Sequence, residues 1–185
     1  MWYFNSLREL GYAKTLIYTF IQQFIPSLAR RNEISGAFTN QNNKVQELTS
    51  HANESDLAAI NKNLELMWKP SIDFSKKNQN VPVDILLSTN MISVGVDIPR
   101  LGLMVITGQP KNTAEYIQAS SRVGRGKDGT GLIFTLYNHA RSRDRSHFEN
   151  FKTFHQSFYQ HVEPSSITPI SSKSRERCLG ALIIG

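Results

Sequence analysis

Two arginines and a glutamine are the residues of this 185-residue chain whose types and spacing best suit a polyphosphate. Gln118, Arg122 and Arg125 are spaced i, i+4 and i+7, which would place them on one face of a helix. Two guanidinium groups and an amide on one face form an array of planar donors that fits phosphate oxygens. The alternative is a solvated basic face, which the surrounding Gln, Ser and Gly residues make less favoured.

A second polar stretch directly follows a short apolar run. Three small polar residues come first, and they are Ser88, Thr89 and Asn90. Gly95 would allow a close approach of the backbone to a ligand, and the carboxylate of Asp97 could accept hydrogen bonds from sugar hydroxyls. In the alternative interpretation this is a strand-to-helix loop in which Thr89, Asn90 and Asp97 only cap helical turns. Taken alone, these residues favour this alternative interpretation.

Short apolar runs alternate with longer helical patterns, which is typical of βαβ units and a parallel sheet. The predicted strands are Trp2–Phe4, Val45–Leu48, 84–88, Leu103–Thr107 and 131–136. The continuous apolar runs at 85–87 and 103–106 predict central strands covered on both faces. Ligands of a parallel sheet bind beyond the carboxyl ends of its strands, so both polar stretches fall where such a sheet would hold a ligand.

Three helical patterns separate these strands, and a fourth follows the last of them. The first begins near Ser6, and Pro26 should end or kink it; the second covers 54–68. A third should start at Thr113, because Asn112 followed by Glu115 has the form of a capping box. The last covers 145–161, and its stripe of aromatic residues is expected to pack against the rest of the protein rather than to stack on bases.

Composition and charge narrow the class of protein. Hydrophobic residues make up 39% and charged residues 19% of the chain, which fits a globular domain, and no apolar run approaches the ~20 residues of a membrane span. Residues 1–110 carry 10 basic and 9 acidic side chains (net +1), whereas residues 111–185 carry 11 and 6 (net +5). This asymmetry permits a phosphate-bearing partner without establishing one.

Cysteine and histidine usage limits redox and metal chemistry. Cys178 is the single cysteine, so a disulfide framework is excluded and a reducing, cytoplasmic location is expected. The five histidines have neither a nearby cysteine nor close carboxylate spacing, so no metal site is expected. Because the chain starts and stops within apolar runs, we also expect it to be part of a longer polypeptide.

The two polar stretches, in this order, resemble motifs V and VI of superfamily 2 helicases and translocases. The first has the form T-x5-G-x-D-x-P from Thr89 to Pro99, and the second the form Q-x-x-S-R-x-x-R from Gln118 to Arg125. Residues 3–7 and 47–50 are similar to the segments at motifs IV and IVa. Two positions depart from the pattern, because Val94 stands where many relatives have Arg and Ser121 where Gly is usual.

The resemblance covers residues 1–137 and implies an α/β fold. It predicts a RecA-like three-layer α/β/α domain with a mainly parallel central sheet, followed at 138–185 by a C-terminal extension with an aromatic-rich helix and a linker. In such motors ATP and Mg²⁺ are held mainly by an N-terminal RecA-like domain of the same parent chain. The C-terminal domain adds arginines in trans that stabilise charge on the γ-phosphate.

Carried over to this sequence, the resemblance assigns three groups of residues. The catalytic group is Arg122 and Arg125 as arginine fingers with Gln118 beside them; the nucleotide-binding group is Gly95 and Asp97; the nucleic-acid-binding group is Ser88, Thr89 and Asn90. The sequence contains no G-x-x-x-x-G-K-[ST] and no D-E-x-[DH]. We therefore expect that this chain does not hydrolyse ATP by itself.

A narrower resemblance extends into the C-terminal extension. The runs 92–105, 108–111 and 134–144, with 147–149, are similar to the helicase subunit of DISARM-type bacterial anti-phage systems. This similarity implies DNA as the nucleic acid and other defence subunits as partners. An RNA helicase domain would share every motif, and a RecA-like docking module without motor activity is a further alternative. The cluster Arg141, Arg143 and Arg145 could track a phosphate backbone or form a solvated, locally paired loop, and both interpretations stay open.

Overall fold

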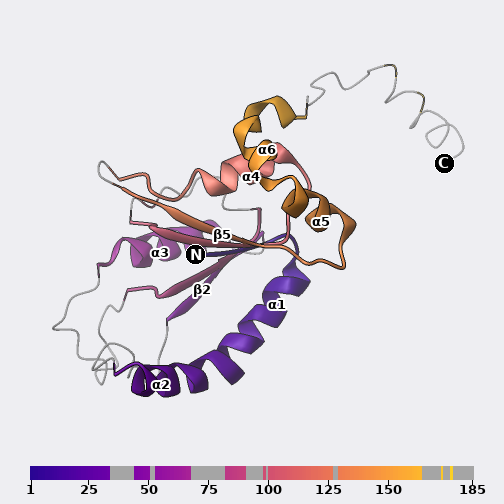
Figure 1. The fold of residues 1–185 in the computed structure, drawn as a ribbon. Helices are drawn as coiled ribbons and strands as arrows, with labels where there is room; N and C mark the ends of the chain where they lie inside the picture. Colours follow the sequence, from indigo (N-terminus) through magenta and orange to yellow (C-terminus); the bar gives the residue numbers. More distant parts are fainter. Residues whose placement is uncertain are drawn as a thin grey trace, which may run out of the picture.

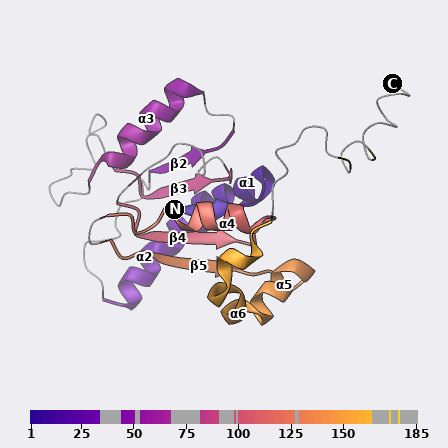
Figure 2. The ribbon, with the colours of Figure 1, turned by 90° about the horizontal axis from the view of Figure 1, so that it is seen from above.

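A single parallel sheet organises the part of the chain that the computed structural model describes, which is residues 1–33, 44–50, 53–67, 82–90, 98, 100–126 and 129–163, with residues 172 and 176. The strands are β1 (Trp2–Phe4), β2 (Val45–Leu48), β3 (Ile85–Ser88), β4 (Leu103–Thr107) and β5 (Leu132–Leu136). They lie in the order β2-β3-β1-β4-β5, and every neighbouring pair is parallel. Helices flank the sheet on both sides (Figures 1 and 2). The predicted RecA-like α/β fold is therefore confirmed.

Alternate side chains of each strand point to opposite faces of the sheet, and helices cover both faces. These helices are α1 (Leu7–Leu16) on one side, and α3 (Glu54–Glu65) and α4 (Thr113–Ser120) on the other. Tyr3 of β1 packs in a core with Leu64 of α3 and Tyr116 of α4. The next residue, Phe4, packs in a second core with Leu10 of α1. Each such buried side chain contributes about 1.5–3 kcal/mol of transfer free energy.

One face of β4 and β5 is more open than the sequence predicts. On the side of the sheet where α1 lies, Leu103, Leu132, Phe134 and Leu136 are each about half exposed. Helix α1 lies over β1 and β3, and β5 forms the edge of the sheet. The predicted burial of 103–106 on both faces is therefore wrong at Leu103.

The first helical pattern continues beyond the proline that was expected to end or kink it. A π-helical segment η1 (Ile17–Ile21) follows α1, and α2 (Gln22–Arg31) contains Pro26 in its interior. Proline lacks an N–H and crowds the carbonyl four residues earlier, which here belongs to Gln22. That residue directly follows the π-helical segment, where the hydrogen-bond register already changes.

The helix predicted over 145–161 is divided into three pieces. They are α5 (Ser142–Glu149), α6 (Phe151–Gln156) and the 3₁₀-helix η3 (Phe158–His161). Asn150 and Ser157 separate them with non-helical backbone angles, φ −106° and −115°. The Asn150 amide donates to the Ser146 carbonyl at 3.0 Å, and the Ser157 hydroxyl donates to the Thr153 carbonyl at 3.0 Å. Such side-chain bonds compete with helix continuation.

The aromatic residues of these helices divide into a packed and an exposed group. The rings of Phe154 and Phe158 lie 6.2 and 5.5 Å from the ring of Tyr116, between centroids, so these two pack as predicted. Phe148 and Tyr159 are exposed. The aromatic packing joins the extension to α4, while the boundary between residues 137 and 138 stays a prediction.

Candidate nucleic-acid and nucleotide site

A pocket of about 300 Å³ lies beyond the carboxyl ends of β1, β2 and β3. Its lining residues come from four segments that each follow a strand, together with one residue of α4, and they are Asn5, Ser6, Leu7, Ser50, Thr89, Asn90, Lys111 and Glu115. This is the edge at which parallel sheets bind their ligands. The fold thus gathers at one place residues that are up to 110 positions apart in the sequence.

The turn after β1 and the end of β3 form the walls of the pocket. Ser6 is the N-cap of α1, and its hydroxyl accepts a hydrogen bond from the Glu9 backbone N–H at 3.3 Å. The Thr89 backbone N–H donates to the Leu48 carbonyl at 3.3 Å, which extends the ladder between β2 and β3 by one residue. The N-terminus of α1 and the residues after β3 line the same pocket, and backbone N–H groups at a helix N-terminus favour anions.

The charges of the pocket are one cation and one carboxylate. The ammonium group belongs to exposed Lys111, and the carboxylate of Glu115 accepts a hydrogen bond from the Tyr3 hydroxyl at 2.6 Å. Burial, together with the neighbouring Glu115, raises the pKa of Tyr3, so its hydroxyl remains a donor. Hydroxyls, amides, a helix N-terminus and one lysine are the groups that bind phosphates and sugars of a nucleic-acid backbone.

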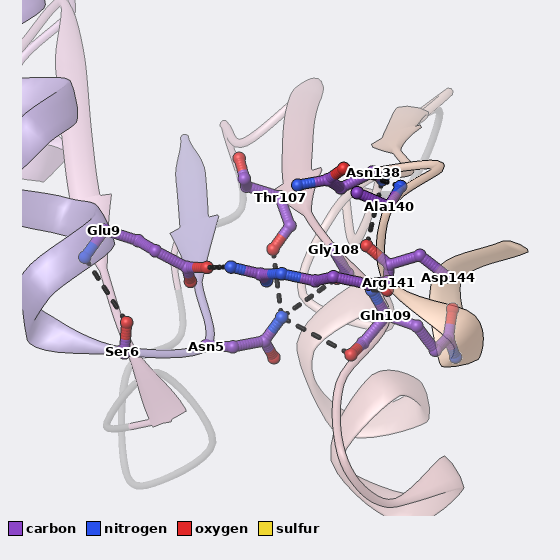
Figure 3. Close-up of polar contacts among 10 residues, drawn as sticks. All are labelled: Asn5, Ser6, Glu9, Thr107, Gly108, Gln109, Asn138, Ala140, Arg141 and Asp144. Carbon is purple, nitrogen blue, oxygen red and sulfur yellow. Dashed lines mark hydrogen bonds and ion pairs between the residues drawn. The ribbon is translucent and has the colours of Figure 1, made fainter.

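The loop between β4 and α4 is held by Asn5 from the side of the pocket. The Asn5 amide nitrogen donates to the carbonyl oxygens of Thr107 at 2.9 Å, Gly108 at 3.1 Å and Gln109 at 3.4 Å (Figure 3). Gly108 has φ +73°, a conformation that favours glycine. The loop thereby turns sharply after β4 and brings Lys111 to the pocket.

The two predicted arginine fingers lie beyond α4 rather than on one face of it. The helix ends at Ser120, so exposed Gln118 is helical, whereas half-buried Arg122 and exposed Arg125 follow in a turn. The expectation that all three share a helical face is therefore wrong. The chain tightens because the Arg122 backbone N–H donates to the Ala119 carbonyl, an i to i−3 bond typical of helix ends.

Gly124 sets the direction of the chain before Arg125. Its φ is +74°, and its N–H donates to the Leu101 carbonyl at 2.8 Å. A Cβ at this position would lie 2.7 Å from the backbone nitrogen of Gly131, so only glycine fits. The Arg125 Nε donates to the Ser121 carbonyl at 2.8 Å, so this hydrogen bond orients the exposed guanidinium group.

The N-terminus of α4 has a different cap from the predicted capping box. The Asn112 side chain makes no capping hydrogen bond, and Glu115 accepts from Tyr3 instead. The carboxylate of Glu163 caps the helix, accepting from the Thr113 N–H at 3.0 and 3.2 Å. Hydrogen bonds from its own backbone and from Thr113 lower the pKa of Glu163. The cap thus comes from a residue 50 positions away, which no local pattern indicates.

The structure brings together only some of the predicted site residues. Thr89 and Asn90 line the pocket, while Ser88 is fully buried within β3. Gly95 and Asp97 lie outside the described residues. Sequence reasoning did not assign Lys111 to a site, although its place just after a predicted strand was a usable signal.

The arginine cluster of the extension is at least partly paired. Arg141 forms an ion pair with Glu9 of α1, and Arg145 pairs with Glu149 at 2.8 Å within α5. Within the described ranges, no three His, Cys, Asp or Glu side chains lie close enough to hold a metal ion. None of the described helices is both long enough and apolar enough to cross a membrane.

The amino-acid sequence of this chain is similar to those of a defence-system protein and an RNA helicase. DISARM protein DrmA of Bacillus paralicheniformis is 45% identical over 182 residues, which are 98% of this chain but only 15% of DrmA. ATP-dependent RNA helicase eIF4A of Kluyveromyces lactis is 26% identical over 72% of this chain and 32% of its own length. The chain thus spans less than a third of these curated relatives.

Solved structures support the same fold. The DUF1998 helicase MrfA bound to DNA superposes with a TM-score of 0.58 at 20% identity, covering 91% of this chain and 18% of that protein. The pattern of the helicase conserved C-terminal domain matches residues 21–127, which is more than half of the chain and includes the predicted motifs V and VI. The chain therefore belongs to the helicase conserved C-terminal domain family.

Proposed function

We propose that this chain is the C-terminal motor domain of an ATP-dependent superfamily 2 helicase or translocase that acts on DNA in a bacterial anti-phage system. The family supports the helicase assignment, and the 45% identity to a DISARM protein supports the defence role. In this proposal the domain has two tasks. It binds the nucleic-acid backbone, and it supplies arginines to a nucleotide held mainly by an N-terminal RecA-like domain of the longer protein.

The observation that carries the first task is the pocket at the carboxyl ends of β1, β2 and β3. Its lining offers hydroxyl, amide and ammonium groups together with the N-terminus of α1. Thr89, Asn90 and Lys111 would contact phosphates and sugars. Such contacts fix position without reading sequence, as a protein that moves along a strand requires.

The second task rests on Arg125 and its neighbours. The guanidinium of Arg125 is exposed and follows a left-handed glycine, so it can face a phosphate outside this chain. ATP, when bound with Mg²⁺, would supply the phosphoryl transfer whose developing charge such arginines stabilise. Gln118 would stand beside Arg122 and Arg125, and Gly95 and Asp97 would approach the nucleotide from motif V.

This chain alone is proposed to be inactive as an ATPase. Its sequence contains neither a P-loop nor an acidic D-E-x-[DH] box, so the phosphate cradle and the metal ligands must come from elsewhere. Purified alone, the 185-residue chain should show no ATP turnover above buffer, whereas the longer protein should hydrolyse ATP. Turnover by the isolated chain that is lost on Arg125→Ala would overturn this part of the proposal.

An RNA helicase domain is the second candidate, because eIF4A, a curated relative, is named as an RNA helicase. Stimulation of the ATPase of the longer protein by single-stranded DNA and by RNA of the same sequence separates the two. The proposal predicts that DNA stimulates more strongly, and a preference for RNA would favour the second candidate. A docking module without motor activity would show neither stimulation nor any effect of Arg125→Ala.

A further inference from the structure

We infer that two carboxylates of the C-terminal extension, Asp144 and Glu163, are positioning residues that hold the β4–α4 loop and so place Lys111 on the pocket. The loop comprises residues 108–112. The inference rests on the proposed function, because it takes the pocket as the place where the nucleic-acid backbone binds. It assigns a role in the motor to a segment outside the helicase motifs.

Asp144 holds the start of the loop. Its side chain is fully buried, and its two carboxylate oxygens accept hydrogen bonds from the backbone N–H groups of Gln109 at 2.9 Å and Asn138 at 3.0 Å (Figure 3). A buried carboxylate is costly unless its oxygens are satisfied, and here both are. Asp144 therefore ties the beginning of α5 to the residue that follows the left-handed Gly108.

Glu163 holds the other end of the loop. It accepts from the Thr113 N–H at 3.0 and 3.2 Å, and from the Thr113 hydroxyl at 3.3 Å. Thr113 is the first residue of α4, so its N–H has no partner within the helix. The carboxylate of Glu163 satisfies it and fixes the point at which the loop becomes helix.

The two carboxylates act on opposite ends of one short segment. Between Gln109 and Thr113 the chain contains buried Pro110, exposed Lys111 and exposed Asn112. Proline fixes its own φ, and the amide of Asn5 holds the carbonyls on the pocket side. With both ends of the loop anchored, the Cα of Lys111 is held in place while its side chain is exposed.

An anchored Cα matters because a lysine on a free loop would lose more conformational entropy when it binds a phosphate. Arg141 strengthens the same link, since it pairs with Glu9 on α1, at the other side of Asn5 (Figure 3). The extension is thus bonded to α1, to the loop and to α4. The extension therefore stabilises the loop that carries Lys111 to the pocket.

The test measures binding of the longer protein to a fluorescein-labelled single-stranded DNA of about 20 nucleotides, by anisotropy at several salt concentrations. The variants are Lys111→Ala, Glu163→Ala, the conservative Glu163→Gln, and the double variant of Lys111→Ala with Glu163→Ala. Glu149→Ala is the matched control, because Glu149 is an exposed carboxylate of the extension that pairs within its own helix. Melting temperatures are recorded for all variants.

Lys111→Ala should raise Kd several-fold and reduce the slope of log K against log salt by about 0.7 to 1, as loss of one phosphate contact does. Glu163→Ala should raise Kd and reduce the slope in the same direction, and Glu163→Gln, which keeps one acceptor oxygen, should recover most of the loss. In the Lys111→Ala background, Glu163→Ala should have little further effect. Glu149→Ala should bind as the unsubstituted protein does.

The outcomes separate the inference from the proposed function. If Lys111→Ala changes neither Kd nor the salt slope, the pocket is not the nucleic-acid site and the proposed function fails there. If Lys111→Ala weakens binding but Glu163→Ala does not, or if the two losses simply add, the positioning role is wrong while the site stands. Asp144→Asn gives a second measurement at the other end of the loop, and unchanged binding by a folded Asp144→Asn protein would also overturn the inference.

Discussion

The replacement of Asp144 by asparagine is the substitution whose effect on stability the structure defines most closely. Asparagine has the same shape as aspartate but only one acceptor oxygen. The Asp144 oxygens separately accept from the N–H groups of Gln109 and Asn138, so one of these N–H groups must face an amide NH₂ group instead. The side chain is fully buried, which leaves no water to replace the lost acceptor.

The magnitude follows from the bonds that are removed. A hydrogen bond to a charged group contributes about 1.5–3 kcal/mol, and one of the two is lost. The neutral amide is less costly to bury, which offsets part of that loss. We therefore expect Asp144→Asn to lower the free energy of unfolding by about 1–2 kcal/mol. For a chain of this size that corresponds to a fall in melting temperature of about 2–8 °C.

The assay is thermal unfolding followed by circular dichroism, with Glu149→Gln as the control. Glu149 is an exposed carboxylate that lies five residues after Asp144 in the sequence, and it pairs with Arg145 on the surface. Removal of such a pair changes stability by less than about 1 kcal/mol. A melting temperature of Asp144→Asn equal to that of Glu149→Gln, within about 1 °C, would refute the reasoning that the buried carboxylate holds the loop.

Three further substitutions have expected outcomes. Gly124→Ala should lower the free energy of unfolding in urea by more than about 2 kcal/mol, because φ is +74° and the new Cβ would lie 2.7 Å from the Gly131 nitrogen; an unchanged midpoint would contradict the left-handed turn. Tyr116→Phe removes a hydroxyl that lies 3.0 Å from His155 Nε2 and should cost about 1 kcal/mol in the same assay. Because hydrogen bonds lower the pKa of Glu163 in the folded state, its stabilisation is complete above the unfolded pKa and is lost as pH falls through the folded pKa. The difference in melting temperature between the unsubstituted protein and Glu163→Ala should therefore shrink as pH falls from about 7 to below about 4, and a constant difference would contradict the cap.

The strands and the polar residues at their ends are predictable from sequence because the signal is local. Apolar runs such as 85–87 and 103–106 predict strands within one residue of their observed bounds, and small polar residues follow directly. Two-residue alternation and the topology of a parallel sheet then place Thr89 and Asn90 at one edge. The pocket follows from these rules.

The contacts that hold the site cannot be predicted from local sequence patterns, because they join residues far apart in the chain. Glu163 caps α4 from 50 positions away, and Glu115 accepts from Tyr3 across 112 positions. The Asn112–Glu115 pattern predicts a local capping box. Instead, Glu163 caps the helix in place of Asn112, and Glu115 bonds to Tyr3. The turn that follows α4 likewise contains a hydrogen bond from the Gly124 N–H to the Leu101 carbonyl, which helical spacing alone does not indicate.

Arg125 is the proposed arginine finger for a nucleotide outside this chain, and the proposed motor function depends on it most. The direct measurement is DNA-stimulated ATP turnover by the longer protein carrying Arg125→Ala, with Arg145→Ala as the matched loss of an exposed arginine. Arginine fingers contribute about 10³–10⁵ in rate, so turnover should fall by about that factor in Arg125→Ala, with DNA affinity largely retained and Arg145→Ala unaffected. Turnover by Arg125→Ala equal to that of Arg145→Ala would contradict the assignment of Arg125 as an arginine finger.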